Sequence, residues 1–378
     1  MKDLGLYIHI PFCKEKCNYC DFYSLPKCAS SLILEYTNVL VSHIERESVE
    51  LKDYEITTIF IGGGTPSHID EESLGRIIKA VKKHLRVSEN AEITIEANPG
   101  TLTREKLQSY LKNGINRLSI GLQSLCDNEL ATLGRIHSVK DFFESYNLAR
   151  EVGFKNISVD IMYGLPSQNT EVLLETLRQV CMISPEHISA YCLKIEENTP
   201  FYKIKDKLTI PNDEEEHQMY IAICNYLAKN GYTQYEISNF AREGFESRHN
   251  LKYWLFEEYI GFGPAAHSFI NGKRYFYESD IRKYIKSLKD ENKAPQKLYD
   301  EETEILQNSR EEYVMLRMRL GCGVDLLEYS QKFGSDFEKD FPKIKDYYGE
   351  YVKKEDDSVH FTPDGFFVSN HILSKVLL

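Results

Sequence analysis

The feature that most limits how this chain can fold is the alternation of short apolar segments with amphipathic ones up to about residue 200. The apolar segments are predicted strands at residues 6–10, 57–61, 92–97, 117–120, 157–161 and 187–191. The amphipathic segments are predicted helices at residues 30–51, 72–85, 104–113, 139–152 and 172–183. Strand–helix repetition favours an α/β fold with a parallel sheet. Six such units fit a partial (β/α)6 barrel, in which ligands are bound at the carboxyl ends of the strands.

Beyond about residue 200 the alternation weakens. A helix is predicted at 212–230, residues 232–274 are rich in aromatics, glycine and histidine, and the polar stretch 286–297 is a predicted linker. A strong helix pattern at 311–320 and a short hairpin predicted at 359–370 indicate a small, mostly helical, winged-helix-like module. We therefore expect two domains, 1–290 and 300–378, the second serving as a lid or a docking unit.

Composition excludes several classes of protein. The chain has 378 residues, more than one core usually holds, and a net charge of -12 without a basic stripe, which argues against nucleic acid as a partner. Its nine cysteines are mostly scattered singly, as in proteins of a reducing compartment. The first strand begins at once, leaving no room for a signal peptide, and no apolar run approaches the length of a membrane span. We expect a cytoplasmic protein without a transmembrane segment.

Three cysteines near the start, Cys13, Cys17 and Cys20, have the spacing C-x3-C-x2-C. Three thiolates so spaced can hold three irons of a cubic [4Fe–4S] cluster, and no fourth cysteine follows before Cys28. A cluster with only three protein ligands has an iron with an open position, where chemistry can occur. The alternatives are zinc, held together with a distant histidine or cysteine, and three unrelated thiols in a loop.

Polar and glycine-rich positions recur at the predicted strand ends. The glycines at 62–66 (GGGTP) would let the backbone approach a ligand, although such a segment is often only a turn, and it lacks the Lys-Ser/Thr of a P-loop. Glu96, Gln123, Arg135 and Asp160 lie at or shortly after strands and also admit purely structural roles. Asp160, inside an apolar strand, needs a partner if it is buried, and Arg135 or a ligand hydroxyl could supply it.

Seven segments together carry a family resemblance. In chain order they are YIHIPFCKEKCNYCDF from Tyr7, GGGTPS from Gly62, IEANP from Ile95, GLQS from Gly121, DIMYGLP from Asp160, ISAYCLKIEENTPF from Ile188 and GFGPAAHS from Gly261. With them the chain resembles, over nearly its whole length, the oxygen-independent coproporphyrinogen III oxidase family of radical S-adenosylmethionine (SAM) proteins, and within it the heme chaperone branch.

The resemblance implies a [4Fe–4S] cluster and SAM as cofactors. Cys13, Cys17 and Cys20 would bind the cluster, and SAM would bind at the open iron. The residues that would contact SAM are Tyr7, Tyr19, Gly64, Thr65, Glu96, Gln123, Arg135 and Asp160, with Lys194 and His267 at the remaining positions.

Two departures separate the chain from the true oxidases. Those carry a further cysteine two residues after the third cluster ligand, where this chain has Phe22. They also have an N-terminal extension, whereas only six residues precede Tyr7 here.

The segment RHNLKYW from Arg248 matches the His-Asn-x-x-Tyr motif of the heme chaperone branch, which implies that His249, Asn250 and Tyr253 bind heme. Imidazole is a common axial ligand of heme iron, and Tyr253 with Trp254 offers flat apolar surface. The alternative for His249 is a loop histidine hydrogen-bonded to backbone. Other histidines that could be the ligand are His9, His68 and His137.

The expected function is therefore that of a heme chaperone that passes heme to apo-hemoproteins, with a homodimer allowed and no catalytic residue assigned. One alternative is an oxygen-independent coproporphyrinogen III oxidase that decarboxylates its substrate by radical SAM chemistry. Another is a radical SAM enzyme with an unrelated substrate. Whether the protein is an enzyme is left open by the sequence.

Overall fold

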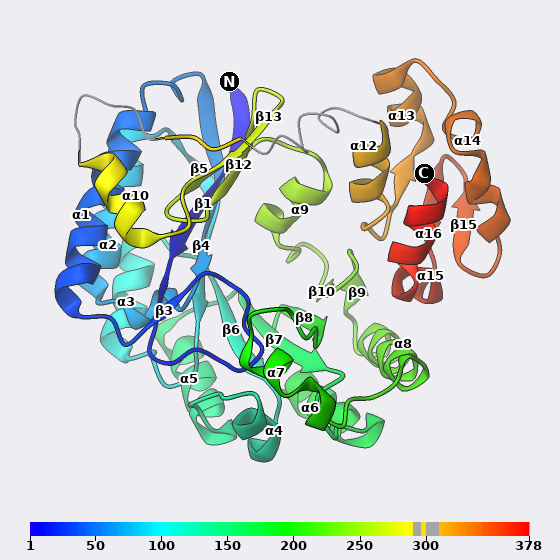
Figure 1. Cartoon of the computed structure of the whole chain (residues 1–378), viewed down its shortest axis with the longest axis horizontal. Coiled ribbons are helices and arrows are strands. Elements are labelled where there is room, and N and C mark those ends of the chain that lie inside the picture. The colour runs from blue at the N-terminus through cyan, green and yellow to red at the C-terminus, as the bar shows by residue number, and fades with distance from the viewer. Residues whose placement is uncertain (290–295, 300–309, 378) are drawn as a thin grey trace.

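The computed structural model describes residues 1–289, 296–299 and 310–377 and is built around an eleven-stranded sheet (Figure 1). Its strand order is β13-β12-β11-β1-β4-β5-β6-β7-β8-β10-β9. The central parallel strands are β1 (Lys2–Ile10), β4 (Tyr54–Gly63), β5 (Val87–Ala97), β6 (Arg117–Gln123), β7 (Ile157–Tyr163) and β8 (His187–Cys192). These strands overlap all six predicted ones, which confirms the strand–helix interpretation.

Helices connect the parallel strands and cover one face of the sheet. They are α1 (Ser30–Glu47), α2 (Glu71–His84), α3 (Arg104–Asn113), α4 (Asp127–Thr132), α5 (Val139–Val152) and α6 (Thr170–Ile183), with the 3-10 turn η1 (Pro66–His68) after β4. Their ends follow local signals: Thr103 caps α3 by accepting a hydrogen bond from the Lys106 amide, and Gly114 ends it at φ 89°. After β8 come α7 (Pro200–Lys203), η2 (Lys205–Lys207) and α8 (Asp213–Lys229).

The two faces of the sheet differ in polarity. On β6, Leu118 and Ile120 are fully buried in the core shared with the outer helices. The alternating residues Arg117 and Ser119 point to the opposite, inner face, because successive side chains of a strand lie on opposite sides. The same alternation puts Thr94, Glu96, Ser158, Asp160, His187 and Ser189 on the inner face. We call this polar interior the lumen.

Short strands extend both edges of the sheet. On one side β11 (Tyr259–Phe262) pairs in parallel with β1, and β12 (His267–Ile270) and β13 (Lys273–Phe276) continue antiparallel. On the other side β10 (Asn239–Ala241) and β9 (Thr233–Gln234) follow β8, also antiparallel. Within the described residues no pairing joins β9 to β13, so the barrel is open, as predicted. The additional parallel strand β11 was not foreseen for residues 232–274.

The C-terminal region is mostly helical around a three-stranded antiparallel sheet, β14-β16-β15. Its elements are α12 (Arg310–Arg317), β14 (Val324–Asp325), α13 (Leu326–Phe333), α14 (Phe337–Asp340), η3 (Pro342–Tyr347), β15 (Val352–Glu355), β16 (Ser358–Phe361), α15 (Pro363–Phe367) and α16 (Ser369–Val376). The hairpin predicted at 359–370 is wrong in position: β15 and β16 form it. Thr362 then caps α15 and Pro363 occupies its first turn, both helix-start signals.

The predicted linker at 286–297 begins inside α10 (Ile281–Leu288), and its residues 290–295 lie outside the described residues. The domain division at 290–300 therefore stays a prediction. The region after 310 contacts the barrel through backbone hydrogen bonds from Ile237 N to Arg319 O (3.0 Å) and from Gly321 N to Tyr235 O (2.8 Å). No helix in the described part of the chain combines the length and apolarity needed to cross a bilayer.

Candidate cofactor site

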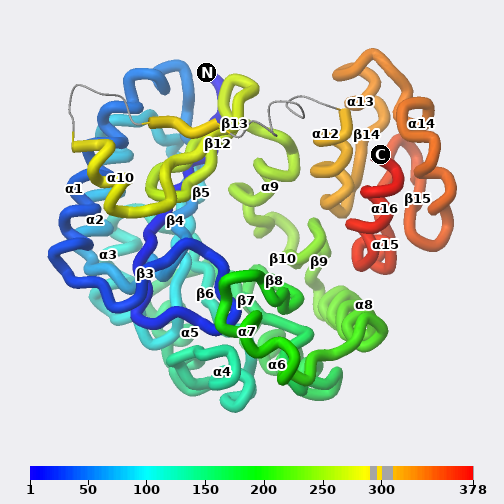
Figure 2. The backbone as a smooth tube through the Cα atoms, in the orientation of Figure 1, coloured from blue at the N-terminus to red at the C-terminus, as the bar shows by residue number. Residues whose placement is uncertain are grey.

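The three motif cysteines follow β1, at the carboxyl edge of the sheet. Cys13 ends β2 (Phe12–Cys13), which pairs with β3 (Leu25–Pro26), so its backbone is fixed and its side chain is only 6% exposed. Cys17 and Cys20 are half-buried in the loop between these strands. This loop, dark blue in Figure 2, extends across to the end of α4 and to α7, where Asn18 N donates to Leu133 O and Phe201 N donates to Asn18 O (2.9 Å each). The loop therefore lies over the mouth of the lumen.

The three thiols are close enough to influence one another. Burial raises the pKa of Cys13, and it raises the pKa of Cys20 to about 11, with ionised Cys17 and Cys13 adding to the shift of Cys20. Among the described residues, however, no three His, Cys, Asp or Glu side chains converge as a closed metal-binding set. The donors fit a three-cysteine cluster in type and number, since mutually repelling buried thiolates need a cation to neutralise them.

The glycine segment after β4 lies directly against the cysteine loop. A Cβ on Gly64 would be 2.9 Å from the backbone of Phe12 and 3.0 Å from Cys13 Sγ, and Gly63 adopts φ +113°. Only glycine permits both the contact and the conformation. Thr65, which follows, donates a hydrogen bond from its hydroxyl to Cys13 Sγ (3.5 Å). The segment predicted to bind SAM thus adjoins the predicted cluster site.

Glu96, at the end of β5, faces the same glycines from the lumen. Gly63 N donates to its Oε2 atom (3.0 Å), and a Cβ on Gly62 would lie 3.1 Å from its carboxylate. Burial raises the pKa of Glu96 to about 8, and the nearby charge of Asp160 adds to the effect. A carboxyl with one backbone donor and a pKa in this range is suited to hydrogen-bond a hydroxyl of a ligand. Gln123 ends β6 in the left-handed conformation (φ 70°), buried beside this site.

Asp160 has serine partners on β6 and on its own strand β7. Its carboxylate accepts hydrogen bonds from Ser119 Oγ (3.1 Å) and Ser158 Oγ (3.3 Å), and the charge of Arg117 favours its ionised form. Of the two partners suggested from the sequence, Arg135 contacts the cysteine loop instead of Asp160, and the ligand hydroxyl stays a prediction. Burial still dominates and raises the pKa of Asp160.

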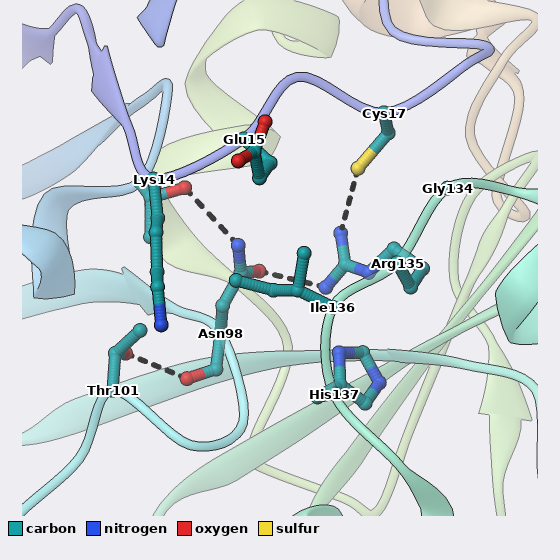
Figure 3. Close-up of a pocket in the computed structure, with 10 residues that line it drawn as sticks. Lys14, Glu15, Cys17, Asn98, Thr101, Gly134, Arg135, Ile136 and His137 are labelled. Atoms are coloured by element: carbon teal, nitrogen blue, oxygen red, sulfur yellow. Dashed lines mark hydrogen bonds between the residues drawn. The ribbon is translucent and has the colours of Figure 1, made fainter. Parts of the chain in front are cut away.

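Arg135 connects the cysteine loop with β6, and Figure 3 shows its hydrogen bonds to Cys17 and Asn98. It donates to Cys17 Sγ (3.6 Å), to Asn98 Oδ1 (2.8 Å) and to Gly121 O (2.8 Å). A recess of about 310 Å³, including its open mouth, lies beside these groups, and Ile136 and His137 also line it. Asn98, which was not among the predicted site residues, is therefore part of this site.

The other predicted SAM residues are distributed around the mouth. Tyr7 on β1 is half-buried with its hydroxyl 2.9 Å from His9 Nδ1, and Tyr19 lies against the Arg135 guanidinium. Lys194, after β8, and His267, on β12, are exposed, and His267 stacks on Phe276. The structure thus brings Thr65 and Arg135 to the cysteine loop, which includes Tyr19, and places Glu96 beside the adjoining glycine segment. The roles of Lys194 and His267 stay predictions.

The predicted heme motif forms helix α9 (Arg248–Trp254), which contacts β4 on one side and α12 on the other (Figure 1). His249 is fully buried: its Nδ1 lies 2.8 Å from Thr58 Oγ1 and its Nε2 lies 2.8 Å from Tyr253 Oη. Burial lowers its pKa to about 3, so the imidazole is neutral. His249 is therefore neither in a loop nor bonded to backbone through its ring, and in this conformation both ring nitrogens are occupied.

Glu92 fixes the start of α9. Its two carboxylate oxygens accept hydrogen bonds from the backbone amides of Arg248 and His249 (3.1 Å each). Asn250 is half-buried, and its backbone amide donates to Ser247 Oγ (3.4 Å). We refer to this arrangement, with His249 held inside the lumen, as the docked position of α9.

The alternative histidines are also engaged or partly covered. His9 is buried between Tyr7 Oη and Tyr23 O (2.9 Å each), and its pKa is lowered to about 4 by burial. His137 Nε2 lies 3.2 Å from Leu122 O, and His68 is half-buried on η1.

Comparisons with known proteins show the family to which the chain belongs. The Radical SAM superfamily model matches residues 7–180, and the HemN C-terminal domain model matches residues 306–368. Heme chaperone HemW of Bacillus subtilis (strain 168) is 36% identical over 98% of both chains, and heme chaperone HemW of Escherichia coli (strain K12) is 38% identical over 75% of this chain and 74% of its own. The solved structure of the Escherichia coli coproporphyrinogen III oxidase HemN, described as a radical SAM enzyme, has a TM-score of 0.83 at 20% identity, covering 99% of this chain and 89% of that one. The chain thus belongs to the heme chaperone HemW family of radical SAM proteins.

Proposed function

We propose that this protein is a heme chaperone that holds a [4Fe–4S] cluster, binds SAM, and binds heme for delivery to apo-hemoproteins. The observation that carries the proposal is the presence in one chain of the three-cysteine loop and of α9 with its His-Asn-x-x-Tyr sequence, at opposite sides of one polar lumen. The full-length similarity to chaperones of that name supports it.

Cys13, Cys17 and Cys20 would hold the cluster, whose open iron would supply a binding position for SAM. Gly64 lets the backbone approach the ligand, Arg135 offers donors for its polar end, and Thr65 lies between this segment and Cys13. Glu96 and Asp160 offer acceptors for hydroxyl groups deeper in the lumen. Tyr7, Tyr19, Gln123, Lys194 and His267 are proposed to complete the SAM site.

Heme would be held through His249, with Asn250 and Tyr253 beside it. An imidazole ligates iron through a free ring nitrogen, and both nitrogens of His249 are occupied in the docked position. We therefore infer that heme binding requires α9 to leave the docked position, so that Nδ1 of His249 separates from Thr58 on β4, while Tyr253 moves with the same helix. The neutral state of His249 is then the form ready to ligate a metal.

The alternative function is oxygen-independent coproporphyrinogen III oxidation, and the shared fold with HemN is the observation that favours it. Against it stands Phe22, 70% exposed at the position where the oxidases have a further cysteine. An apolar ring there can pack against a ligand but cannot bind metal.

Anaerobically reconstituted protein, titrated with heme and followed by absorption spectroscopy, tests the proposal. We expect stoichiometric heme binding that His249→Ala weakens at least tenfold, and transfer of heme to an apo-hemoprotein. Formation of protoporphyrinogen from coproporphyrinogen would support the alternative, and absence of heme binding would refute the chaperone function.

We further propose a cytoplasmic location, a division into domains 1–290 and 300–378, and no nucleic-acid partner. A homodimer is compatible with this proposal.

A further inference from the structure

The side chain of Asn98 lies between the hydrogen-bonding partners of two motif cysteines. Its Nδ2 donates to Thr65 Oγ1 (3.1 Å), and Thr65 in turn donates to Cys13 Sγ (3.5 Å). Its Oδ1 accepts from Arg135 Nη2 (2.8 Å), and Arg135 donates through Nη1 to Cys17 Sγ (3.6 Å). A continuous path thus runs from Cys13 to Cys17, with Asn98 at its centre, and Figure 3 shows the part from Asn98 through Arg135 to Cys17.

The chemistry of the path fixes the direction of every hydrogen bond in it. An arginine only donates, so the Asn98 atom facing Arg135 must be the carbonyl oxygen. The amide nitrogen therefore faces Thr65 and occupies its oxygen as an acceptor. The Thr65 hydroxyl proton is left to point at Cys13 Sγ. Asn98 consequently determines that both thiolates receive a hydrogen bond.

The backbone of Asn98 is held independently of its side chain. Its amide donates to Ser67 Oγ (3.1 Å), and its carbonyl accepts from Thr101 Oγ1 (2.6 Å). Pro99 follows, which restricts the preceding residue to extended conformations. The side chain is thus presented in one position before any ligand binds.

We propose that Asn98 is a positioning residue of the cluster site, orienting Thr65 and Arg135 so that the thiolates of Cys13 and Cys17 are each hydrogen-bonded. The inference rests on the proposed binding of a cluster by these cysteines. Hydrogen bonds to ligating sulfur stabilise the reduced, more negative cluster and raise its reduction potential. Asn98 would then set this potential without touching the cluster.

The test is a double-mutant cycle on the reduction potential of the reconstituted protein, measured by redox titration with electron paramagnetic resonance. Asn98→Leu keeps the size and adds no charge, and we expect it to lower the equilibrium constant for one-electron reduction about tenfold, or about 59 mV. Thr65→Val should shift it in the same direction. In the Thr65→Val background, Asn98→Leu should shift the reduction potential less than in the wild type, because the hydrogen bond from Thr65 to Cys13 is already absent.

The matched control is Asn113→Leu. Asn113 is also half-buried, and its side chain on α3 donates to Ser109 O (2.8 Å). This substitution should leave the reduction potential of the cluster unchanged. If Asn98→Leu does not retain iron, Asn98→Asp, which keeps the acceptor for Arg135 and removes the donor to Thr65, replaces it in the cycle. Wild-type potential in the Asn98 variants, or strictly additive shifts, would overturn the inference. A wild-type protein that forms no cluster would instead refute the proposed function.

Discussion

Replacing Thr58 by valine tests whether the docked position of His249 limits heme binding. The Thr58 hydroxyl is fully buried, 2.8 Å from His249 Nδ1, and valine has nearly the same shape without the hydrogen-bonding group. Losing this bond and leaving a buried ring nitrogen unpaired should destabilise the docked position by about 1.4 kcal/mol. The effect on heme affinity depends on whether heme binds to the docked or to the undocked form of α9.

If only undocked α9 binds heme, the apparent dissociation constant equals the intrinsic one divided by the undocked fraction. A destabilisation of about 1.4 kcal/mol raises a small undocked fraction about tenfold, so the apparent affinity should become about tenfold tighter and association correspondingly faster. The assay is heme titration and stopped-flow absorption at the Soret band. Thr94→Val is the matched control, since Thr94 is a buried threonine of the adjacent strand whose hydroxyl has no hydrogen-bond partner in the described residues. Equal heme affinity in wild type, Thr58→Val and Thr94→Val, with loss in His249→Ala, would refute the reasoning.

Three further predictions concern pH and metal content. The pKa of His249 is about 3 in the docked position against an ordinary 6.5, so the free energy that favours docking is greatest above pH 6.5 and should fall by about 2 kcal/mol at pH 5. The fluorescence of Trp254, the one tryptophan of the chain, should change between pH 6.5 and pH 5. The fluorescence of His249→Gln should not change over the same range. Because the pKa of Glu96 is raised from 4.5 to about 8, the free energy of unfolding of the cluster-free protein should fall as the pH rises from 4.5 to 8. Urea unfolding of Glu96→Gln should not show this fall. The same pH profile in the wild type and in Glu96→Gln would contradict the buried carboxyl. Cys13→Ser should abolish iron binding, whereas Cys28→Ser should retain it, and equal loss of iron in both would make Cys28 a fourth ligand.

The central barrel could be predicted from sequence because each strand there is followed by its own helix, and the outer faces are continuous apolar runs. The strands at the edges of the sheet could not be predicted in this way. Strand β11 contributes Tyr259–Phe262 beside β1, more than two hundred residues away in the chain, and nothing local to its sequence indicates that partner. The hairpin predicted at 359–370 failed for a different reason: an apolar run suggested strand, but Thr362 and Pro363 start a helix.

For the site, the spacing and flanking residues of Cys13, Cys17 and Cys20 predict cluster ligands, since ligands of one loop are close in sequence, and this assignment stays a prediction. Partners contributed by different strands were harder to foresee. The link from Asp160 to Ser119 depends on the register of β6 and β7, which the sequence does not state. Asn98 was overlooked because one asparagine before a proline usually indicates a turn, and its role is visible only when Thr65 and Arg135 meet around it.

The separation of an apolar outer face from a polar inner face has a consequence for how such proteins diversify. Packing against the helices is confined to residues such as Leu118 and Ile120, so an exchange of an inward side chain leaves that packing intact. Evolution can then replace ligand contacts one at a time without rebuilding the scaffold. The HemN structure, only 20% identical yet superimposable at a TM-score of 0.83, illustrates how far sequence can drift while the architecture persists.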